Sequence, residues 1–329
     1  MTTSDLTHLR GAPKAPAYDK RLMGVAIVME IAAMGLAYMA VYVPVLGPKL
    51  TRAEANQHWT PAIISALVVA TGSAWVVRTA RRRRRADPSL REIRAGDEGP
   101  LPRIPQSLRI EGVPAVWVWR GVAFSLGTVP FSVVFGAPLW LAWLAILSPW
   151  FPIIALEARR KAADNMLLAC FGLLVILQLL HMVEHTTQIA QLGLSGGALA
   201  KAHGVIGQLD FELVHFIADT TLWISLGVLA IRFKARNAWL WVAFAAAAFH
   251  QVEHFYLFYL NLFEHTVYLS GGAAGIMGHY GLIGSPLDRP YLHYSYNFIV
   301  IVPMLIAFWD EGRYEDRMRS RKVAKAAPA

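Results

Sequence analysis

Histidines and acidic residues recur in one order in the C-terminal half of the chain. The string His-Met-Val-Glu-His occupies positions 181–185, and His-Gln-Val-Glu-His occupies positions 250–254. In an α-helix, residues spaced i, i+3 and i+4 share a face, so the two imidazoles and the carboxylate of each string project together. A further histidine follows each string. The predicted metal ligands are therefore His181, Glu184, His185, His215, His250, Glu253, His254 and His293.

Other landmarks keep the same order in the two copies. Each string is followed by Leu-Ser-Gly-Gly, at 194–197 and at 269–272, and an aspartate stands five residues before each last histidine. Such repetition indicates a duplicated helical hairpin, with insertions confined to the connections. We expect four polar residues to orient the ligands, and two histidines of the glycine-rich connections to transfer protons. The orienting residues are Asp210, Asp219, Asp288 and Asn297, and the proton-transfer residues are His203 and His279.

The donor set restricts the metal. Six imidazoles and two carboxylates suit two ions per chain, and iron or copper is favoured, with zinc and manganese also compatible. The single cysteine, Cys170, lies in an apolar stretch, so a cysteine metal site cannot be built within one chain. The pattern resembles, in geometry rather than in motif, the helical bundles whose carboxylates and histidines project inward to hold two metal ions.

Two motif comparisons assign no family. The His-x-x-Glu-His string matches a soluble metallopeptidase pattern, but that motif occurs once per domain with a distant third ligand. Membrane histidine-box oxygenases also gather many histidines around two irons, yet this chain lacks their adjacent His-His pairs.

The elements that position these residues are predicted to be membrane helices. The chain has 329 residues, of which 56% are hydrophobic, and a mean hydropathy of +0.41. A helix needs about 20 mostly apolar residues to cross a bilayer. The predicted fold is an all-α integral membrane protein of about eight transmembrane helices, with a C-terminal four-helix core made of two parallel-repeat hairpins. The predicted spans are 22–46, 59–78, 113–134, 137–156, 164–192, 207–231, 237–263 and 291–310.

Composition shifts predict the domain organisation. A polar, proline-rich stretch separates the first two spans from the rest, and basic clusters mark the later boundaries. The predicted segments are an N-terminal transmembrane hairpin (1–85), a cytoplasmic connector without a core (86–114), a second hairpin (115–162), metal-binding repeat 1 (163–236), metal-binding repeat 2 (237–312) and a basic tail (313–329).

The net charge of +9 comes from short basic runs between spans, such as Arg81 to Arg85. This pattern is typical of cytoplasmic loops and of contact with anionic lipid, rather than of nucleic-acid binding. It places both termini in the cytoplasm, the protein in the cytoplasmic membrane of a bacterium, and the metal site in the outer half of the bilayer. The partners expected are the lipid bilayer and an apolar substrate or a redox partner, and the oligomeric state stays open.

Three functions fit these patterns. The favoured one is a membrane oxidoreductase or oxygenase that uses a paired metal centre on a small or apolar substrate. The alternative is a transporter or handling protein for divalent metal, which would need polar groups continuing across the membrane. The third is a haem-binding electron-transfer subunit, which would leave the two glutamates without a role.

Overall fold

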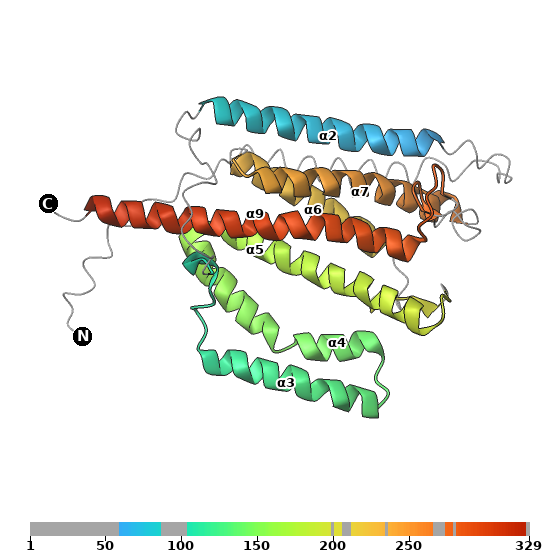
Figure 1. Ribbon diagram of the computed structural model, residues 1–329, viewed down its shortest axis with the longest axis horizontal. Helices are drawn as coiled ribbons and strands as arrows, with labels where there is room; N and C mark the ends of the chain where they lie inside the picture. Colours follow the sequence, from blue (N-terminus) through green and yellow to red (C-terminus); the bar gives the residue numbers. More distant parts are fainter. Residues whose placement is uncertain are drawn as a thin grey trace. The chain divides into compact units, whose positions relative to one another are not determined.

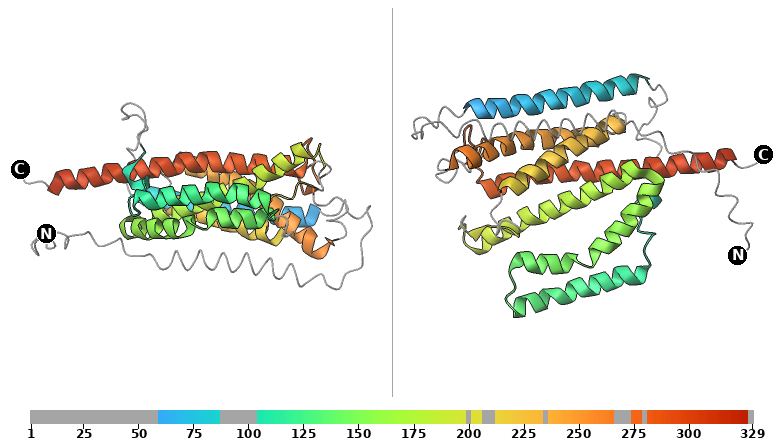
Figure 2. Two further views of the ribbon diagram at one scale, coloured as in Figure 1. Left: turned by 90° about the horizontal axis from the view of Figure 1, so that it is seen from below. Right: turned by 180° about the vertical axis from the view of Figure 1, so that it is seen from behind.

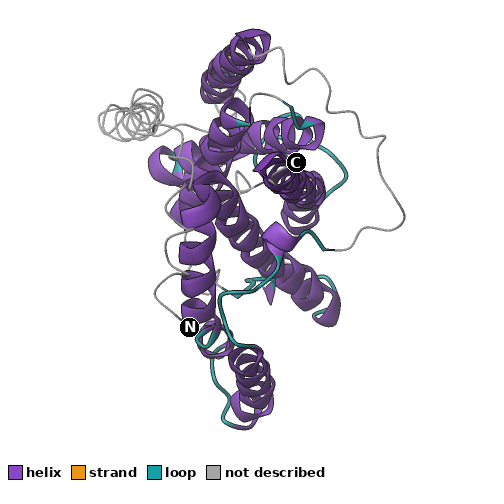
Figure 3. Cartoon of the chain, turned by 90° about the vertical axis from the view of Figure 1, so that its left-hand side faces the viewer, coloured by secondary structure: helices purple, strands orange, loops and turns teal. Residues whose placement is uncertain are grey.

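The computed structural model describes most of the chain after the first predicted span, which itself lies outside the described residues (Figure 1). The unit considered is 47–329. Within its described part the secondary structure is helical, without strands (Figure 3). The described residues are 59–86, 104–198, 201–205, 212–233, 236–265, 274–278 and 281–326.

Four of the described helices are long and apolar enough to cross a membrane, namely α2, α5, α6 and α9. Helix α7 has sufficient length, but its polar string at 250–254 lowers its hydropathy. The count of eight spans therefore stays a prediction. The helices are α2 (Trp59–Ala86), α3 (Ala115–Val134), α4 (Leu139–Leu147), α5 (Trp150–Leu194), α6 (Glu212–Arg232), α7 (Ala238–Phe263) and α9 (Arg289–Ala326), with a short 3-10 helix η4 (Gln106–Leu108).

Helices α5, α6, α7 and α9 pack as a closed ring, each against two neighbours, and α2 packs outside against α6 and α7. Figures 1 and 2 show these long helices running alongside one another. The two helices that carry the His-x-x-Glu-His strings, α5 and α7, are diagonal partners in the ring. Their strings therefore face a common interior. We call the end where α5 leads to α6 and α7 leads to α9 the loop end, and the opposite end the basic end.

The predicted span 137–156 is not one helix. Gly136, with φ of 59°, makes the expected turn after α3, but helix α4 stops at Leu147 and α5 begins at Trp150. Pro149 separates the two because its ring cannot continue the preceding helix. A nine-residue helix is too short to cross a bilayer, so α4 and the first part of α5 together make the return arm beside α3.

Helix α5 bends sharply at Asn165. This residue has φ of −150° and ψ of 95°, which is extended rather than helical backbone. Its side-chain oxygen accepts a hydrogen bond from the Leu168 backbone N–H at 3.1 Å, which is the geometry of an N-cap. The stretch before Asn165 therefore belongs to the α3–α4 hairpin, and the stretch after it is the ring helix that carries His181 and His185.

The C-terminal part of the predicted connector has a defined structure, contrary to the expectation of a segment without a core. The Asp316 carboxylate accepts the backbone N–H groups of Gln106 and Ser107 at 2.6 and 3.0 Å, and Lys161 donates to the carbonyl oxygen of Ser107 at 2.6 Å. Helix α9 runs through the predicted tail to Ala326. Hydrogen bonds thus join residues 104–112 to both α5 and α9.

Candidate metal centre

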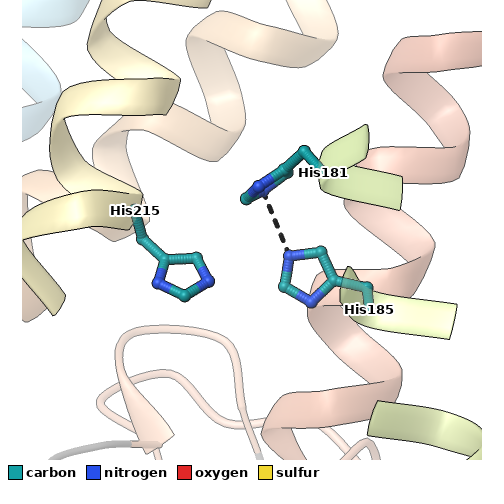
Figure 4. A group of neighbouring side chains, drawn as sticks. All are labelled: His181, His185 and His215. Carbon is teal, nitrogen blue, oxygen red and sulfur yellow. Dashed lines mark hydrogen bonds between the residues drawn. The ribbon is translucent and has the colours of Figure 1, made fainter. Parts of the chain in front are cut away.

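Six histidines converge inside the ring, in two groups of three. Site A contains His181 and His185 from α5 and His215 from α6 (Figure 4), and site B contains His250 and His254 from α7 and His293 from α9. Within each site, one ring nitrogen from every histidine lies within 4.8 Å of the other two. The i, i+4 spacing puts two imidazoles on one face of a helix, and the neighbouring helix supplies the third.

The nitrogen spacing suits a shared ion. His181 Nε2 lies 3.1 Å from His185 Nε2, and His250 Nε2 lies 2.8 Å from His254 Nε2. Two nitrogens bound to one ion at about 2.1 Å lie about 3.0 Å apart at a right angle and about 3.4 Å apart in a tetrahedron. Both pairs are close to the right-angle value, so the two imidazoles of each helix are spaced to bind one metal ion together.

Two of the histidines have a hydrogen-bond partner at Nδ1, and the Nδ1 of His254 faces a carboxylate without a hydrogen bond, so that Nε2 is the atom left toward the centre. His185 Nδ1 lies 2.8 Å from Gln188 Oε1, His293 Nδ1 lies 3.2 Å from the Arg289 carbonyl oxygen, and His254 Nδ1 lies 3.5 Å from Glu212 Oε1. This is the arrangement by which proteins orient metal-binding imidazoles. Among the described residues, the buried Nε2 of His293 has no hydrogen-bond partner, as expected for a ligand atom.

Asp219 lies between the two sites. Its Oδ2 atom is 2.9 Å from His254 Nε2, 3.8 Å from His250 Nε2 and 4.0 Å from His181 Nε2. The residue is 3% exposed. A buried carboxylate at this position would contact an ion in either site, and its charge would offset part of the charge of the metal. Asp219, expected to orient or supplement the histidines, thus lies within 4.0 Å of one imidazole nitrogen of site A and two of site B, although it belongs to neither group of three.

The two sites are adjacent. The ring centroids of His215 and His254 lie 6.0 Å apart with nearly parallel planes, and those of His185 and His293 lie 5.7 Å apart. Each contact joins one ring from site A to one from site B. The six imidazoles and Asp219 therefore form one continuous cluster that would place two ions near each other.

The two predicted glutamate ligands lie in neither group of three. Glu184 accepts the Val205 backbone N–H at 2.7 Å, and Glu253 accepts the Ile276 backbone N–H at 2.8 Å. Both carboxylates are buried, at 3% and 2% exposure. At the loop end, each carboxylate is thus hydrogen-bonded to the connection that follows its own helix. The two contacts occupy corresponding positions of the two hairpins.

The other predicted site residues are dispersed. Asn297 is buried on α9, where its Oδ1 accepts a hydrogen bond from Gln178 at 2.7 Å and its amide donates to the His293 carbonyl oxygen at 2.9 Å. His203 is exposed and Asp288 is half-buried in the connections. Asp210 and His279 lie outside the described residues.

Sequence analysis missed four residues that contact the cluster. Gln188 and Glu212 face imidazole Nδ1 atoms, Arg289 pairs with Glu212, and the ring of Tyr296 packs on His250 with centroids 4.8 Å apart. Glu212 stands three residues before His215, and Gln188 stands three after His185. These helical spacings were the available signal, because i and i+3 share a face.

Comparisons with known proteins identify no relative, because no family model, no curated protein and no solved structure matches this chain.

Proposed function

We propose that this protein is a membrane oxidoreductase whose resident cofactor is a pair of transition-metal ions, one in site A and one in site B. The ligands would be the six histidines and Asp219. The observation that carries the proposal is the position of Asp219 Oδ2 within 4.0 Å of histidines from both sites. A shared carboxylate between two three-histidine groups suits two cooperating ions better than two independent ones.

The donor chemistry is compatible with a redox metal. Imidazole binds iron, copper, zinc and nickel, and the absence of thiolate argues against sites that demand soft ligands. Six neutral imidazoles and one carboxylate contribute only one negative charge, because Glu212 is already paired with Arg289. Iron or copper in such a pair would supply electron transfer to or from a bound small molecule. The protein would contribute the positioning of the ions and the exclusion of water.

The surroundings of the cluster support a fixed centre rather than a transport path. Toward the basic end, Gln178 bonds Asn297 and Gln251 bonds Thr220. Beyond these pairs lie buried apolar side chains, including Leu226 and Met304, each 0% exposed. Among the described residues of the ring, buried polar groups return only at Asn237 and Glu311, where Glu311 pairs with Arg236. A moving cation would need polar groups at this depth.

Glu184 and Glu253 take a different role in this proposal from the one their spacing indicated. Because both carboxylates accept backbone N–H groups from the connections, we propose that they hold the loop end closed over the centre. The metal ions would then depend on the histidines rather than on the glutamates.

Metal analysis and an optical spectrum of the detergent-purified protein test the proposal. We expect about two iron or copper ions per chain by the donor-set argument, and no Soret band. His185→Ala and His254→Ala should each lose metal, whereas the double variant Glu184→Gln, Glu253→Gln should retain it. A Soret band would indicate haem instead, and zinc or manganese that exchanges freely would indicate transport.

A further inference from the structure

The two sites differ in exposure. In site A the His181 side chain is 14% exposed and His215 is half-buried, whereas His185 is 2% exposed. In site B the exposures of His250, His254 and His293 are 1%, 0% and 2%. Two otherwise similar histidine groups therefore differ in how far a small molecule can approach them.

The residues at one pair of equivalent positions, 218 and 296, account for the difference in exposure between the two sites. Three residues after His293, Tyr296 packs its ring against that of His250 in a T-shaped contact, with centroids 4.8 Å apart. Three residues after His215, the chain has Ala218, which is exposed. The aromatic ring that contacts His250 thus has only the methyl group of Ala218 as its counterpart at the corresponding position of α6, which shares a helix face with His215.

The seam between α5 and α6 is also the most lightly packed of the four seams in the ring. Both helices carry exposed apolar side chains, including Leu177 on α5 at 58% and Val214 on α6 at 41% exposure. Such residues suit contact with lipid chains or with an apolar molecule, and they offer no hydrogen bonds to a hydrated ion. These exposed side chains of α5 and α6 therefore suit the approach of an apolar molecule.

We propose that site A is the substrate-binding site, reached from the bilayer through the α5–α6 seam beside Ala218, and that site B is closed by Tyr296. The substrate class is a small apolar or weakly polar molecule that partitions into the membrane. This inference rests on the proposed function for the presence of the ions, but the unequal access belongs to the chain itself.

Histidine modification tests the access without metal. The metal-free protein in phosphatidylcholine vesicles is treated with diethyl pyrocarbonate, a small neutral ester that modifies imidazole, and each histidine is quantified by peptide mass spectrometry. We expect His181 and His215 to react about tenfold faster than His250 and His293, because reaction at a closed site requires local opening.

Substitutions at positions 218 and 296 test whether the side chain at each position controls access to its site. Ala218→Tyr should slow modification of His181 to the rate of His250, and Tyr296→Ala should accelerate modification of His250. Ile217→Tyr adds the same ring at a neighbouring position of α6 that is 54% exposed, and it should leave His181 unchanged. Tyr296→Phe should keep site B closed, since the ring and not the hydroxyl covers it. Equal rates at the two sites, or no effect of Ala218→Tyr, would overturn the proposal.

The substrate class is tested on the metal-loaded protein by optical titration with n-butyl isocyanide, an apolar metal ligand, and with azide, a hydrated anion. The isocyanide should bind one ion per chain, and Ala218→Tyr should reduce its association rate without reducing metal content. Azide binding as fast as the isocyanide would overturn the assignment to an apolar substrate. Absence of metal would contradict the proposed function, whereas the modification rates would still decide the access.

Discussion

At the scale of single residues, the two halves of the cluster are similar in their histidines and differ in what surrounds them. Asp219 on α6 is a carboxylate whose Oδ2 lies 2.9 Å from His254. The equivalent residue on α9 is Asn297, an amide occupied by its bond to Gln178. One carboxylate therefore lies within 4.0 Å of imidazole nitrogens from both sites. This asymmetry suits a shared anionic ligand, because a second buried carboxylate beside it would add like-charge repulsion.

Replacement of Asp219 tests this role. We expect Asp219→Asn to lower metal affinity by about 10- to 100-fold or more, since loss of a group that binds or orients ligands has effects of that size. The variant loaded with copper(II) should also show weaker magnetic coupling in its electron paramagnetic resonance spectrum. Asp164→Asn, which removes a carboxylate that is 48% exposed, is the control. Unaltered metal content and coupling in Asp219→Asn would reject a shared ligand.

At the scale of elements, the connections at the loop end are fastened by matched contacts. Gly204 has φ of 67°, and a Cβ atom there would lie 2.0 Å from Glu184 Oε1. Gly275 has φ of 72°, and a Cβ atom there would lie 1.9 Å from Glu253 Oε1. Each glycine provides both a left-handed backbone conformation and the space for the carboxylate to reach the next N–H group.

Alanine at either glycine should detach the connection from its helix. We expect Gly204→Ala to destabilise the protein by about 1 to 3 kcal/mol, from backbone strain and from the loss of a charge-assisted hydrogen bond. Gly196→Ala is the matched control, because its φ is also 67° but nothing lies within 4 Å of the added Cβ. Thermal unfolding in detergent gives both values. If the two variants lose equal stability, strain alone explains the effect and the contact with Glu184 contributes nothing.

At the scale of the whole molecule, the cluster joins all four helices of the ring. Helices α5, α6, α7 and α9 each contribute at least one histidine. Ions bound at this junction would therefore stabilise the folded arrangement of the ring as a whole, because a ligand that binds only the folded state lowers its free energy.

Removal of metal should lower the apparent melting temperature of the whole bundle. A ligand at 100 times its dissociation constant stabilises the folded state by about 2.7 kcal/mol. When a chelator removes the metal from the wild-type protein in detergent, the free energy of unfolding should fall by at least that order for each ion removed. His254→Ala should respond less to the chelator, since it lacks a ligand of site B. A wild-type melting curve that is the same before and after verified metal removal would contradict a centre that holds the ring together.

The sequence by itself determined the helical class and most of the histidine cluster. The periodicity of apolar residues and the hydropathy of a segment are local properties of the sequence. A string such as His181 to His185 therefore already predicts a helix with two imidazoles on one face. The repetition of that string at His250 to His254 was enough to propose two groups and to add His215 and His293 to them.

Tertiary structure decided what each polar group faces. The spacing that placed Glu184 with the histidines could not show that its carboxylate turns to the backbone of the following connection, because the path of that connection depends on the packing of the ring. The position of Asp219 against His254 likewise depends on the contact between α6 and α7. The contact between the rings of Tyr296 and His250 arises only when α7 packs on α9. Side-chain direction within one helix follows from local geometry, whereas contacts between helices follow from the fold as a whole.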